Sequence, residues 1–476
     1  MVGIFSNGDL PEDFGISGIS CYFPKTFVKQ NELEKANGIA AGKYTIGLGQ
    51  TEMAFCSDKE DSVSLALNAT QMLLDEYQID PSSVGFLAVG SETLVDKSKS
   101  IMSALMPLFG EDVEMSGADR KHACYGGTQA LFDALAWLNW TYAEDHKLAI
   151  VVCTDIAVYD EGPARCTGGA GAVALLLSPG APLVFDRGLQ STIACHSYDF
   201  FKPVGSYNCE YPIVAGADSI SCYLGFLSNC YKKYKQKSKV KRGQSSLSLA
   251  DFDAACFHSP FTKLVRKAVA VMVAEDARDG RRVMGEENRE EIERLRGSDE
   301  PTNLSLISSD ALKASEHSWI HLSNPNLEMN RRLGNMYTPS LYVQLVGYLS
   351  RLEEERMERE EGKERRILMY SYGSGSIASV FSFTLNEGRT ERLKRMVQVS
   401  RSIMGRLEER IERTPEEYAE TMAQREKFYV QRVPSTPSSL CSPSLHPLFP
   451  GSFHLSSIDE NNRRHYARTD KKHAIM

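Results

Sequence analysis

The first half of the chain alternates between short apolar runs and longer segments with helical spacing, and this alternation limits the possible folds most strongly. Ser62–Tyr77 carries apolar residues at helical spacing, and Val84–Gly90 is an apolar run that ends before a polar Ser-Glu-Thr. Thr128–Trp140 repeats the helical pattern, and buried-strand patterns follow at Leu148–Thr154 and Ala172–Leu177. Strands that alternate with helices in this way predict an α/β fold built on a layered sheet.

An internal similarity between two segments of the sequence indicates a duplicated architecture. Thr167–Leu177 and Ser371–Phe383 both begin as turns rich in glycine and small residues, and both continue as apolar strands. They lie about half the chain apart, as two copies of one unit would. A nucleotide-binding loop is the alternative for such turns, but neither segment contains the GxxxxGK[ST] pattern that cradles phosphates.

Composition excludes several classes of protein. The chain has 476 residues, 42% of them hydrophobic, which is enough for a large core. The formal net charge of −8 argues against nucleic acid as a partner. The 11 cysteines form no CxxC pair and no Cys/His metal spacing, so a zinc site and a dithiol redox site are both disfavoured. This many free thiols favour a reducing compartment.

Four further expectations concern location and peripheral segments. The N-terminal segment lacks the basic and apolar regions of a secretory signal and the Arg-rich character of a transit peptide, which predicts a cytoplasmic protein. No run of 18 uncharged apolar residues occurs, so no membrane span is expected. The charge-dense segments Glu275–Glu300 and Arg351–Arg366 predict solvated helices, and the Pro- and Ser-rich Val433–Pro450 predicts an irregular loop.

Cys124 is the first candidate for a catalytic residue. It stands in Lys-His-Ala-Cys-Tyr-Gly-Gly-Thr, just before the helical stretch that begins near Thr128. The positive end of a helix and its unpaired N–H groups lower the pKa of a thiol there and make it a nucleophile. The two glycines would let the backbone approach a bound acyl group. A structural, buried cysteine is the alternative at this position.

His258 and Glu92 are the partners that thiol chemistry would need. His258 follows an apolar strand-like run, and Pro260 marks the start of a helix on which Lys263 and Lys267 share one face. Glu92 directly follows the run Val84–Gly90, where partial burial would raise its pKa and suit it to acid–base work. The alternatives are a packed histidine, surface lysines and a capping glutamate.

Nine segments in order resemble the 3-hydroxy-3-methylglutaryl-CoA synthase family of the thiolase superfamily, over almost the whole chain from about Gly15 to Arg468. They are Ala41-Gly-Lys-Tyr-Thr-Ile-Gly-Leu-Gly-Gln50, Ser91-Glu-Thr-Leu-Val-Asp-Lys-Ser-Lys-Ser100, Ala123-Cys-Tyr-Gly-Gly-Thr128, Asp155-Ile-Ala-Val-Tyr159, Thr167-Gly-Gly-Ala-Gly-Ala-Val-Ala-Leu-Leu176, Tyr198-Asp-Phe200, Phe257-His-Ser-Pro260, Gly334-Asn-Met-Tyr-Thr338 and Ser371-Tyr-Gly-Ser-Gly375.

The resemblance implies a fold and a reaction. The fold is α/β and thiolase-like, with two pseudo-duplicated halves in a five-layered αβαβα body. Residues 13–180 would form the half that carries Glu92 and Cys124, and residues 181–468 the half that carries His258 and charged helical insertions. The reaction joins acetyl-CoA to acetoacetyl-CoA and water, through an acetyl-cysteine, to give 3-hydroxy-3-methylglutaryl-CoA and CoA early in the mevalonate pathway to isoprenoids and sterols.

The resemblance also implies roles for individual residues. Cys124 matches the acylated cysteine, His258 the histidine that assists acetoacetyl-CoA, and Glu92 the general acid/base. Asp155 and Asp199 match aspartates that support the acyl-transfer site. Positions that contact the substrate or its CoA arm are matched by Ala41, Thr167, Ser219, Lys263, Lys267, Asn335 and Ser374. The family needs no metal or other cofactor, takes CoA thioesters as its small-molecule partners, and forms homodimers without nucleic acid or membrane.

Departures from the family pattern occur near the site. The family usually has asparagine where this chain has His122, and it has an asparagine in the segment Gly162–Thr167 that holds Pro163 and Cys166 here. Extra residues also precede Asn335. Because Asn326–Arg332 contains Glu328, Arg331 and Arg332, whose charges are rarely buried unpaired, the sequence predicts a solvent-exposed bulge there, with Asn335 still facing the acyl site.

Two rival functions remain at the level of sequence. A ketoacyl synthase of the same superfamily uses cysteine with histidine and asparagine or a second histidine, so the Ser-Glu-Thr around Glu92 argues against it. A non-catalytic thiolase-fold protein that binds acyl-CoA is favoured by Pro163 and the extra residues, and is opposed by the presence of Glu92, Cys124 and His258 together.

Overall fold

The computed structural model describes residues 13–204, 210–297, 307–352, 364–430, 436 and 446–470. Most of the Pro- and Ser-rich segment 433–450 and the charged residues 353–363 lie outside these ranges. Within the described ranges, no helix combines the length and the apolar character that crossing a lipid bilayer needs.

Two sets of strands share one topology, which confirms the duplication that the sequence indicated. In the first half, β1 (Gly15–Tyr22) lies antiparallel to β7 (Gly169–Ser178), β7 antiparallel to β6 (Leu148–Ala157), and β6 parallel to β4 (Val84–Gly90). The second half repeats each of these pairings in the same order, with β9 (Ser191–Ala194), β14 (Ile377–Leu385), β13 (Arg365–Gly373) and β12 (Ala254–Phe257).

Strand β8 (Leu183–Phe185) joins the two halves. It pairs antiparallel with β1 on one side and with β14 on the other, so the sheets of both halves form one hydrogen-bonded path. The short β5 (Asp119–Arg120) extends the path at β4. Small sheets lie outside it, formed by β2 (Thr26–Lys29), β3 (Glu52–Ala54) and β15 (Ile411–Arg413), by β10 (Phe200–Phe201) and β11 (Ile213–Val214), and by β16 (Phe453–Ile458) and β17 (Arg464–Arg468).

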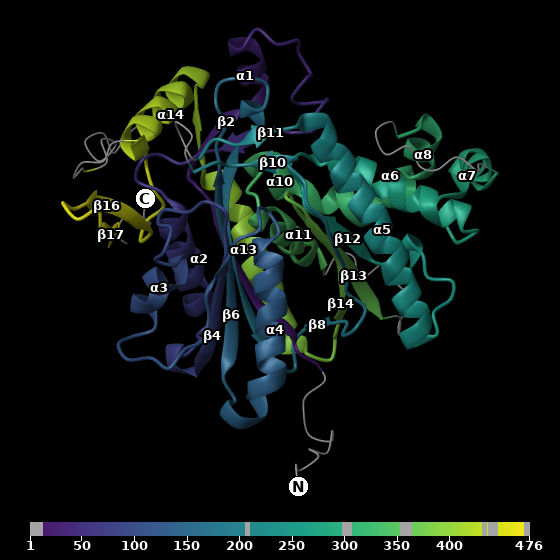
Figure 1. Cartoon of the computed structure of the whole chain (residues 1–476), viewed down its shortest axis with the longest axis horizontal. Coiled ribbons are helices and arrows are strands. Elements are labelled where there is room, and N and C mark those ends of the chain that lie inside the picture. Colours follow the sequence, from purple (N-terminus) through teal and green to yellow (C-terminus); the bar gives the residue numbers. More distant parts are fainter. Residues whose placement is uncertain are drawn as a thin grey trace.

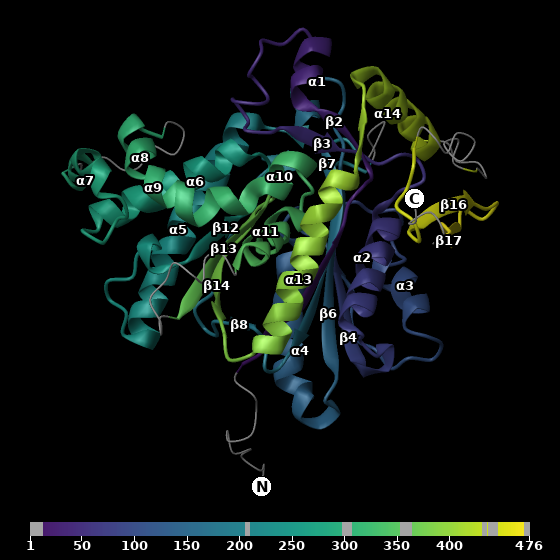
Figure 2. The same ribbon diagram turned by 180° about the vertical axis from the view of Figure 1, so that it is seen from behind.

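Helices cover both faces of each sheet and give the layered body that is typical of the thiolase fold (Figures 1 and 2). The outer layers hold α2 (Ser62–Tyr77) on the first half, and α5 (Gly216–Arg242) and α6 (Thr262–Arg278) on the second. Between the sheets lie α4 (Gly126–Asp145), α11 (Pro339–Ser350) and α13 (Thr390–Arg406). The remaining helices include α1 (Gln30–Ala36), α3 (Ile101–Leu105), α7 (Arg289–Arg296), α8 (Ser309–Ala314) and α14 (Pro415–Val430).

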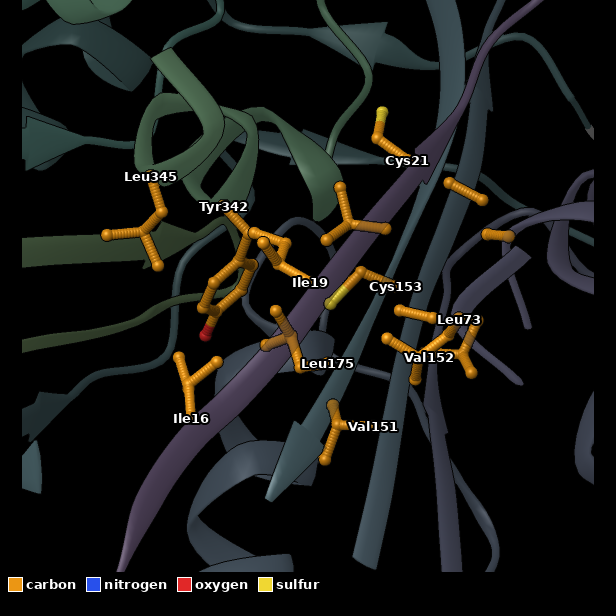
Figure 3. Close-up of a cluster of buried hydrophobic side chains, with 14 of the residues drawn as sticks. Ile16, Ile19, Cys21, Leu73, Val151, Val152, Cys153, Leu175, Tyr342 and Leu345 are labelled. Atoms are coloured by element: carbon orange, nitrogen blue, oxygen red, sulfur yellow. The ribbon is translucent and has the colours of Figure 1, made fainter. Parts of the chain in front are cut away.

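The core explains why the strands of the first half read as continuous apolar runs. Every residue of β4 and β7 is buried, because helices pack on both faces of the sheet. Neighbouring residues of β6 point to opposite faces: Val152 lies beside Leu73 of α2, and Cys153 faces Tyr342 of α11 (Figure 3).

Two charged segments are less exposed than the sequence predicted. Glu275 and Asp276 belong to the buried end of α6, where Lys232 and Lys235 neutralise them. Arg366 lies inside β13 and is 5% exposed, because Asp186 lies 3.2 Å from its guanidinium. The prediction of solvated helices is therefore wrong for both of these ends, and the reason is that oppositely charged side chains from distant segments pair with them.

The predicted solvent-exposed bulge at Asn326–Arg332 is also wrong. The segment forms the short turn Asn324–Leu327 and helix α10 (Glu328–Leu333), and Leu327, Met329 and Leu333 are fully buried. Its charges lie at the edge of the helix and are paired, Arg332 with Glu52 at 3.0 Å and also with Glu408. An amphipathic turn of helix thus buries its apolar side while its charges find partners.

This burial predicts how much the inserted segment contributes to the stability of the fold. Met329→Ala should lower the free energy of unfolding by about 2–5 kcal/mol, because it leaves a cavity in a packed core. Glu328→Ala is the matched control: its side chain is 46% exposed, so a change within about 0.5 kcal/mol is expected. Unfolding in urea measures both values, and equal effects of the two substitutions would contradict the buried packing.

Candidate active site

The candidate catalytic residues lie where equivalent strands of the two halves end. Glu92 follows β4 and His258 follows β12, and these strands hold the same place in their sheets. Asp155 lies near the end of β6, and Ser374 follows β13, which is the equivalent strand. The carboxyl ends of parallel strands are where α/β folds place their sites. Of these residues, Glu92 from the first half and Ser374 from the second line one pocket, and His258 is not among the residues that line it.

Asp155 fixes the turn that carries Glu92. Its Oδ1 accepts hydrogen bonds from the N–H of Glu92 at 2.8 Å, from the N–H and hydroxyl of Thr93, and from the hydroxyl of Ser91. Its Oδ2 accepts a bond from the N–H of Thr338, at 3.1 Å. The side chain is fully buried. A buried carboxylate with this many donors holds the surrounding backbone in one conformation.

Cys124 sits on a tight turn at the start of α4. Ala123 before it has a φ of +43°, which few non-glycine residues adopt. The Thr338 hydroxyl donates to the carbonyl oxygen of Cys124 at 2.7 Å and accepts from the N–H of Gly127 at 3.0 Å. A Cβ on Gly127 would lie 2.3 Å from the sulfur of Cys153, so only glycine fits there. The Gly-Gly pair thus allows helix and strand to pack closely.

Glu92 and Cys124 contact each other directly. The thiol Sγ donates to Oε1 of Glu92 at 4.0 Å. Burial raises the pKa of Glu92 to about 7, with Lys202 opposing the rise and Asp155 adding to it. Burial raises the pKa of Asp155 as well, and Lys202 opposes that rise too.

The thiol of Cys124 does not show the lowered pKa that its place before a helix predicted. Burial, followed by the negative charges of Glu92 and Asp155, raises its pKa well above the ordinary value, and Lys202 works in the opposite direction. The position just before α4 was predicted correctly, but the carboxylates that surround the sulfur come from the turn after β4 and from β6, and the sequence did not show that they are neighbours.

His258 is held rigidly and stays neutral. Its N–H donates to the carbonyl of Tyr370 at 2.8 Å, and its carbonyl accepts from the hydroxyl of Tyr223 at 2.7 Å. The side chain is 2% exposed, and this burial lowers the pKa of the imidazole to about 3. A neutral imidazole carries one N–H and offers a hydrogen bond rather than a positive charge.

A pocket of about 600 Å³ opens beside Glu92. It is lined by residues from the turn after β4, by the turn before α4, by the segment around β10, and by Ser374 and Gly375. His122, which replaces the family's usual asparagine, is one of the lining residues. Burial lowers the pKa of His122 and keeps its ring neutral. The volume suits a small acyl group with part of its carrier.

Asp199 shapes the turn that carries Ser374. Its Oδ1 accepts from the N–H of Gly375 at 3.0 Å and from the Ser197 hydroxyl, and its Oδ2 accepts from the Tyr372 hydroxyl at 2.7 Å. Burial raises the pKa of Asp199, but these donors together lower it below its ordinary value. Asp199 thus holds the turn of Ser374 as Asp155 holds the turn of Glu92, although it follows β9 and does not lie on β13, the strand equivalent to β6.

Thr167 and Asn335 are brought side by side by a bridge between Gly169 and Gly334. The N–H of Asn335 donates to the carbonyl of Gly168, and its side-chain oxygen accepts from the N–H of Tyr337 and the hydroxyl of Ser340. Its side-chain oxygen therefore serves the local turn. Pro163, which replaces a polar residue of the family, is exposed at the surface nearby.

The proposed CoA-side residues Ala41, Lys263 and Lys267 gather at a different place from the pocket beside Glu92. The loop that contains Ala41 packs on the start of α6, where the N–H of Lys263 donates to the carbonyl of Leu48 at 3.0 Å. Ser219 lies in the first turn of α5, which begins beside Asp199 because the N–H of Ala215 donates to the carbonyl of Asp199.

Sequence reasoning missed several residues of the site. Lys202 lies 3.5 Å from Glu92, and the buried rings of Tyr159 and Tyr337 pack in one cluster with Cys124. Thr338 contacts both Cys124 and Asp155. Lys202 lies two residues after the segment Tyr198–Phe200, which resembles the family, and this position was the one feature of the sequence that could have indicated a place for Lys202 at the site. Among the described residues, no cluster of three or more His, Cys, Asp or Glu side chains is arranged to hold a metal ion.

Comparison with known proteins agrees with this geometry. Models described as hydroxymethylglutaryl-coenzyme A synthase N terminal and C terminal match residues 10–182 and 183–469. The chain belongs to the hydroxymethylglutaryl-CoA synthase family. It is accordingly an enzyme of the acyltransferase type.

Named relatives cover nearly the full length. The chain is 40% identical to hydroxymethylglutaryl-CoA synthase of Caenorhabditis elegans over 98% of its length and 96% of that protein. It is 41% identical to the human mitochondrial hydroxymethylglutaryl-CoA synthase over 96% of its length and 90% of that protein. The solved structure of MvaS in complex with 3-hydroxy-3-methylglutaryl coenzyme A matches with a TM-score of 0.78 and 31% identity, over 96% of this chain and 99% of the other.

Proposed function

We propose that this hydroxymethylglutaryl-CoA synthase condenses acetyl-CoA with acetoacetyl-CoA on Cys124, with Glu92 as general acid/base. The observation that carries the proposal is the contact of 4.0 Å between Cys124 Sγ and Glu92 Oε1 in a buried site. The similarity to a structure that holds 3-hydroxy-3-methylglutaryl coenzyme A supports CoA thioesters as the substrates.

In the first step, the sulfur of Cys124 attacks the carbonyl carbon of acetyl-CoA. The bond between that carbon and the CoA sulfur breaks, and the thiol proton ends on the departing CoA. The N–H groups of Cys124 and Ser374 stabilise the oxyanion, and one such donor contributes about 3 kcal/mol. No net proton is left on the enzyme by this exchange.

In the second step, Glu92 removes a proton from the methyl group of the acetyl-cysteine. The thioester carbonyl stabilises the carbanion, which attacks the ketone carbon of acetoacetyl-CoA. His258, neutral because it is buried, donates its hydrogen bond to the ketone oxygen as negative charge develops there. Glu92 returns its proton to the new alkoxide, and water then hydrolyses the bond to Cys124. A pKa of about 7 suits a group that must take up and release a proton near neutral pH.

We also propose that no metal or organic cofactor takes part, since the thioester itself activates the methyl group. Ala41, Thr167, Ser219, Lys263, Lys267 and Asn335 stay the proposed contacts of the substrate and its CoA arm. The cytoplasmic location stays a prediction from the sequence, and mitochondrial relatives occur in the family.

We propose that two copies of the chain form a homodimer. Apolar side chains are exposed around the pocket, with Tyr198 and Val204 each 67% exposed and Leu94 39% exposed, and Ile213 and Val214 are exposed on β11. Exposed apolar surface of this kind is typical of interfaces. Light scattering on the purified protein should give twice the mass of the chain. A monomer at micromolar concentration would contradict the proposal.

The assignment of the nucleophile predicts which cysteine carries the acetyl group. After incubation with acetyl-CoA, peptide mapping by mass spectrometry should find the label on Cys124, and Cys124→Ala should carry none. Cys195 is an exposed thiol and serves as the internal control. Label on Cys195 alone would overturn the assignment. CoA thioester binding without any label would favour the non-catalytic rival.

The role of Glu92 predicts a selective loss. Glu92→Gln should still acetylate Cys124, because that step needs no net proton uptake, but its condensation rate should fall about 100-fold or more. In the native enzyme, condensation should slow as pH falls below about 7, since the carboxylate is then protonated. Asp96→Asn, a carboxylate change in the same pocket, is the control and should condense at nearly the native rate. Single-turnover assays of acetylated enzyme with acetoacetyl-CoA separate these outcomes.

A further inference from the structure

Lys202 brings a positive charge into contact with the proposed general acid/base. It follows β10, and its side chain is 12% exposed. Its Nζ lies 3.5 Å from Oε1 of Glu92, the same oxygen that faces the sulfur of Cys124 at 4.0 Å. The ammonium, the carboxylate and the thiol thus form a continuous set of contacts at the pocket.

Aromatic rings fix the position of the ammonium. Nζ lies 4.2 Å from the ring centroid of Tyr337 and 5.7 Å from that of Phe200. Tyr337 is fully buried, and its own ring packs against Phe200 with centroids 5.7 Å apart. A lysine that is desolvated between aromatic faces is held by cation–π attraction and differs from a mobile surface lysine.

The charges around Glu92 come from several elements. Cys124 faces it from the start of α4, Asp155 from β6, and Lys202 from the segment after β10. The phenols of Tyr159 and Tyr337 lie close to it. The other titratable groups that line the pocket are Asp96, Lys97, Lys121, His122, His196, Tyr198 and Glu210. Lys202 is the cation that contacts the carboxylate, whereas Asp155 places a second negative charge nearby.

We infer that Lys202 is a positioning residue for Glu92, whose ammonium holds the carboxylate against Cys124 and favours its ionised form. The inference rests on the proposed function of Glu92 as acid/base. It adds a fourth side chain to the Cys124, His258 and Glu92 set, and one that acts through Glu92 rather than on the substrate.

The groups around Glu92 determine in which direction its pKa changes when Lys202 is removed. Burial and Asp155 raise the pKa of Glu92, and Lys202 lowers it. Without the ammonium, the pKa of Glu92 rises further, so less carboxylate is present at neutral pH and condensation slows. The loss is recovered at higher pH, where the carboxyl ionises again. A purely structural role for Lys202 would lower the rate by the same factor at every pH.

A direct titration tests the inference independently of catalysis. The infrared band of the protonated Glu92 carboxyl is assigned by its loss in Glu92→Gln, and its midpoint is followed against pH in the full-length protein. Lys202→Met should raise the midpoint by about one unit or more, since a contacting opposite charge shifts a carboxyl by about that amount. Lys202→Arg keeps the charge and should stay near the native midpoint. Lys202→Gln repeats the test if the methionine variant does not fold.

Lys97→Met is the matched control, because Lys97 lines the same pocket and its removal should leave the midpoint of Glu92 in place. An unshifted midpoint in Lys202→Met and Lys202→Gln overturns the inference, as does an equal shift in Lys97→Met. The single-turnover condensation profile is then compared: in Lys202→Met the rate should fall about fivefold or more at neutral pH and recover in alkali. A shifted midpoint with an unchanged condensation profile keeps the electrostatic role of Lys202 but contradicts the proposed function of Glu92.

Discussion

Five hydrogen bonds converge on the buried carboxylate of Asp155, and the arrangement of the candidate site depends on them. Four come from the turn that carries Glu92, and one comes from Thr338, which in turn binds the carbonyl of Cys124. One side chain therefore ties the acid/base turn of β4 to the nucleophile turn of α4 and to the segment before α11. A buried carboxylate is stable only while these donors are present, so the three segments can be expected to keep their relative positions.

Duplication supplies the second half of the site. The order and direction of the strands repeat, so β4 and β12 hold equivalent places in their sheets, but a glutamate follows one strand and a histidine follows the other. The carboxylates Asp155 and Asp199 each hold a turn near the site in one half. In each half a buried aspartate thus holds a turn at the site, although the two aspartates do not come from equivalent strands. The environment then gives Glu92 and His258 different chemistry: burial raises the pKa of Glu92 to about 7, and it lowers the pKa of His258 so that the imidazole stays neutral.

Inference from the sequence succeeded where periodicity or local turn chemistry decides structure. Ser62–Tyr77 and Val84–Gly90 are predicted with their observed bounds, and the helix starts near Cys124 and Pro260 occur as predicted. It failed where contacts between distant segments decide. The charges of Asn326–Arg332 suggested an exposed bulge, yet Glu52 and Glu408 pair with Arg332 and allow the apolar side of α10 to enter the core.

The sequence by itself determined the alternation of strands and helices, the duplicated turn-and-strand pattern, and the family through nine ordered segments. It also determined which residue types stand at strand ends. Only the tertiary structure decided which of these meet: that Glu92 contacts Cys124, that Lys202 contacts Glu92, and that both carboxylates raise the pKa of the thiol. The reason is that contacts and pKa values depend on distance and burial. Cys124 and Lys202 lie 32 and 110 positions after Glu92 in the chain, and they become its neighbours only when the strands assemble.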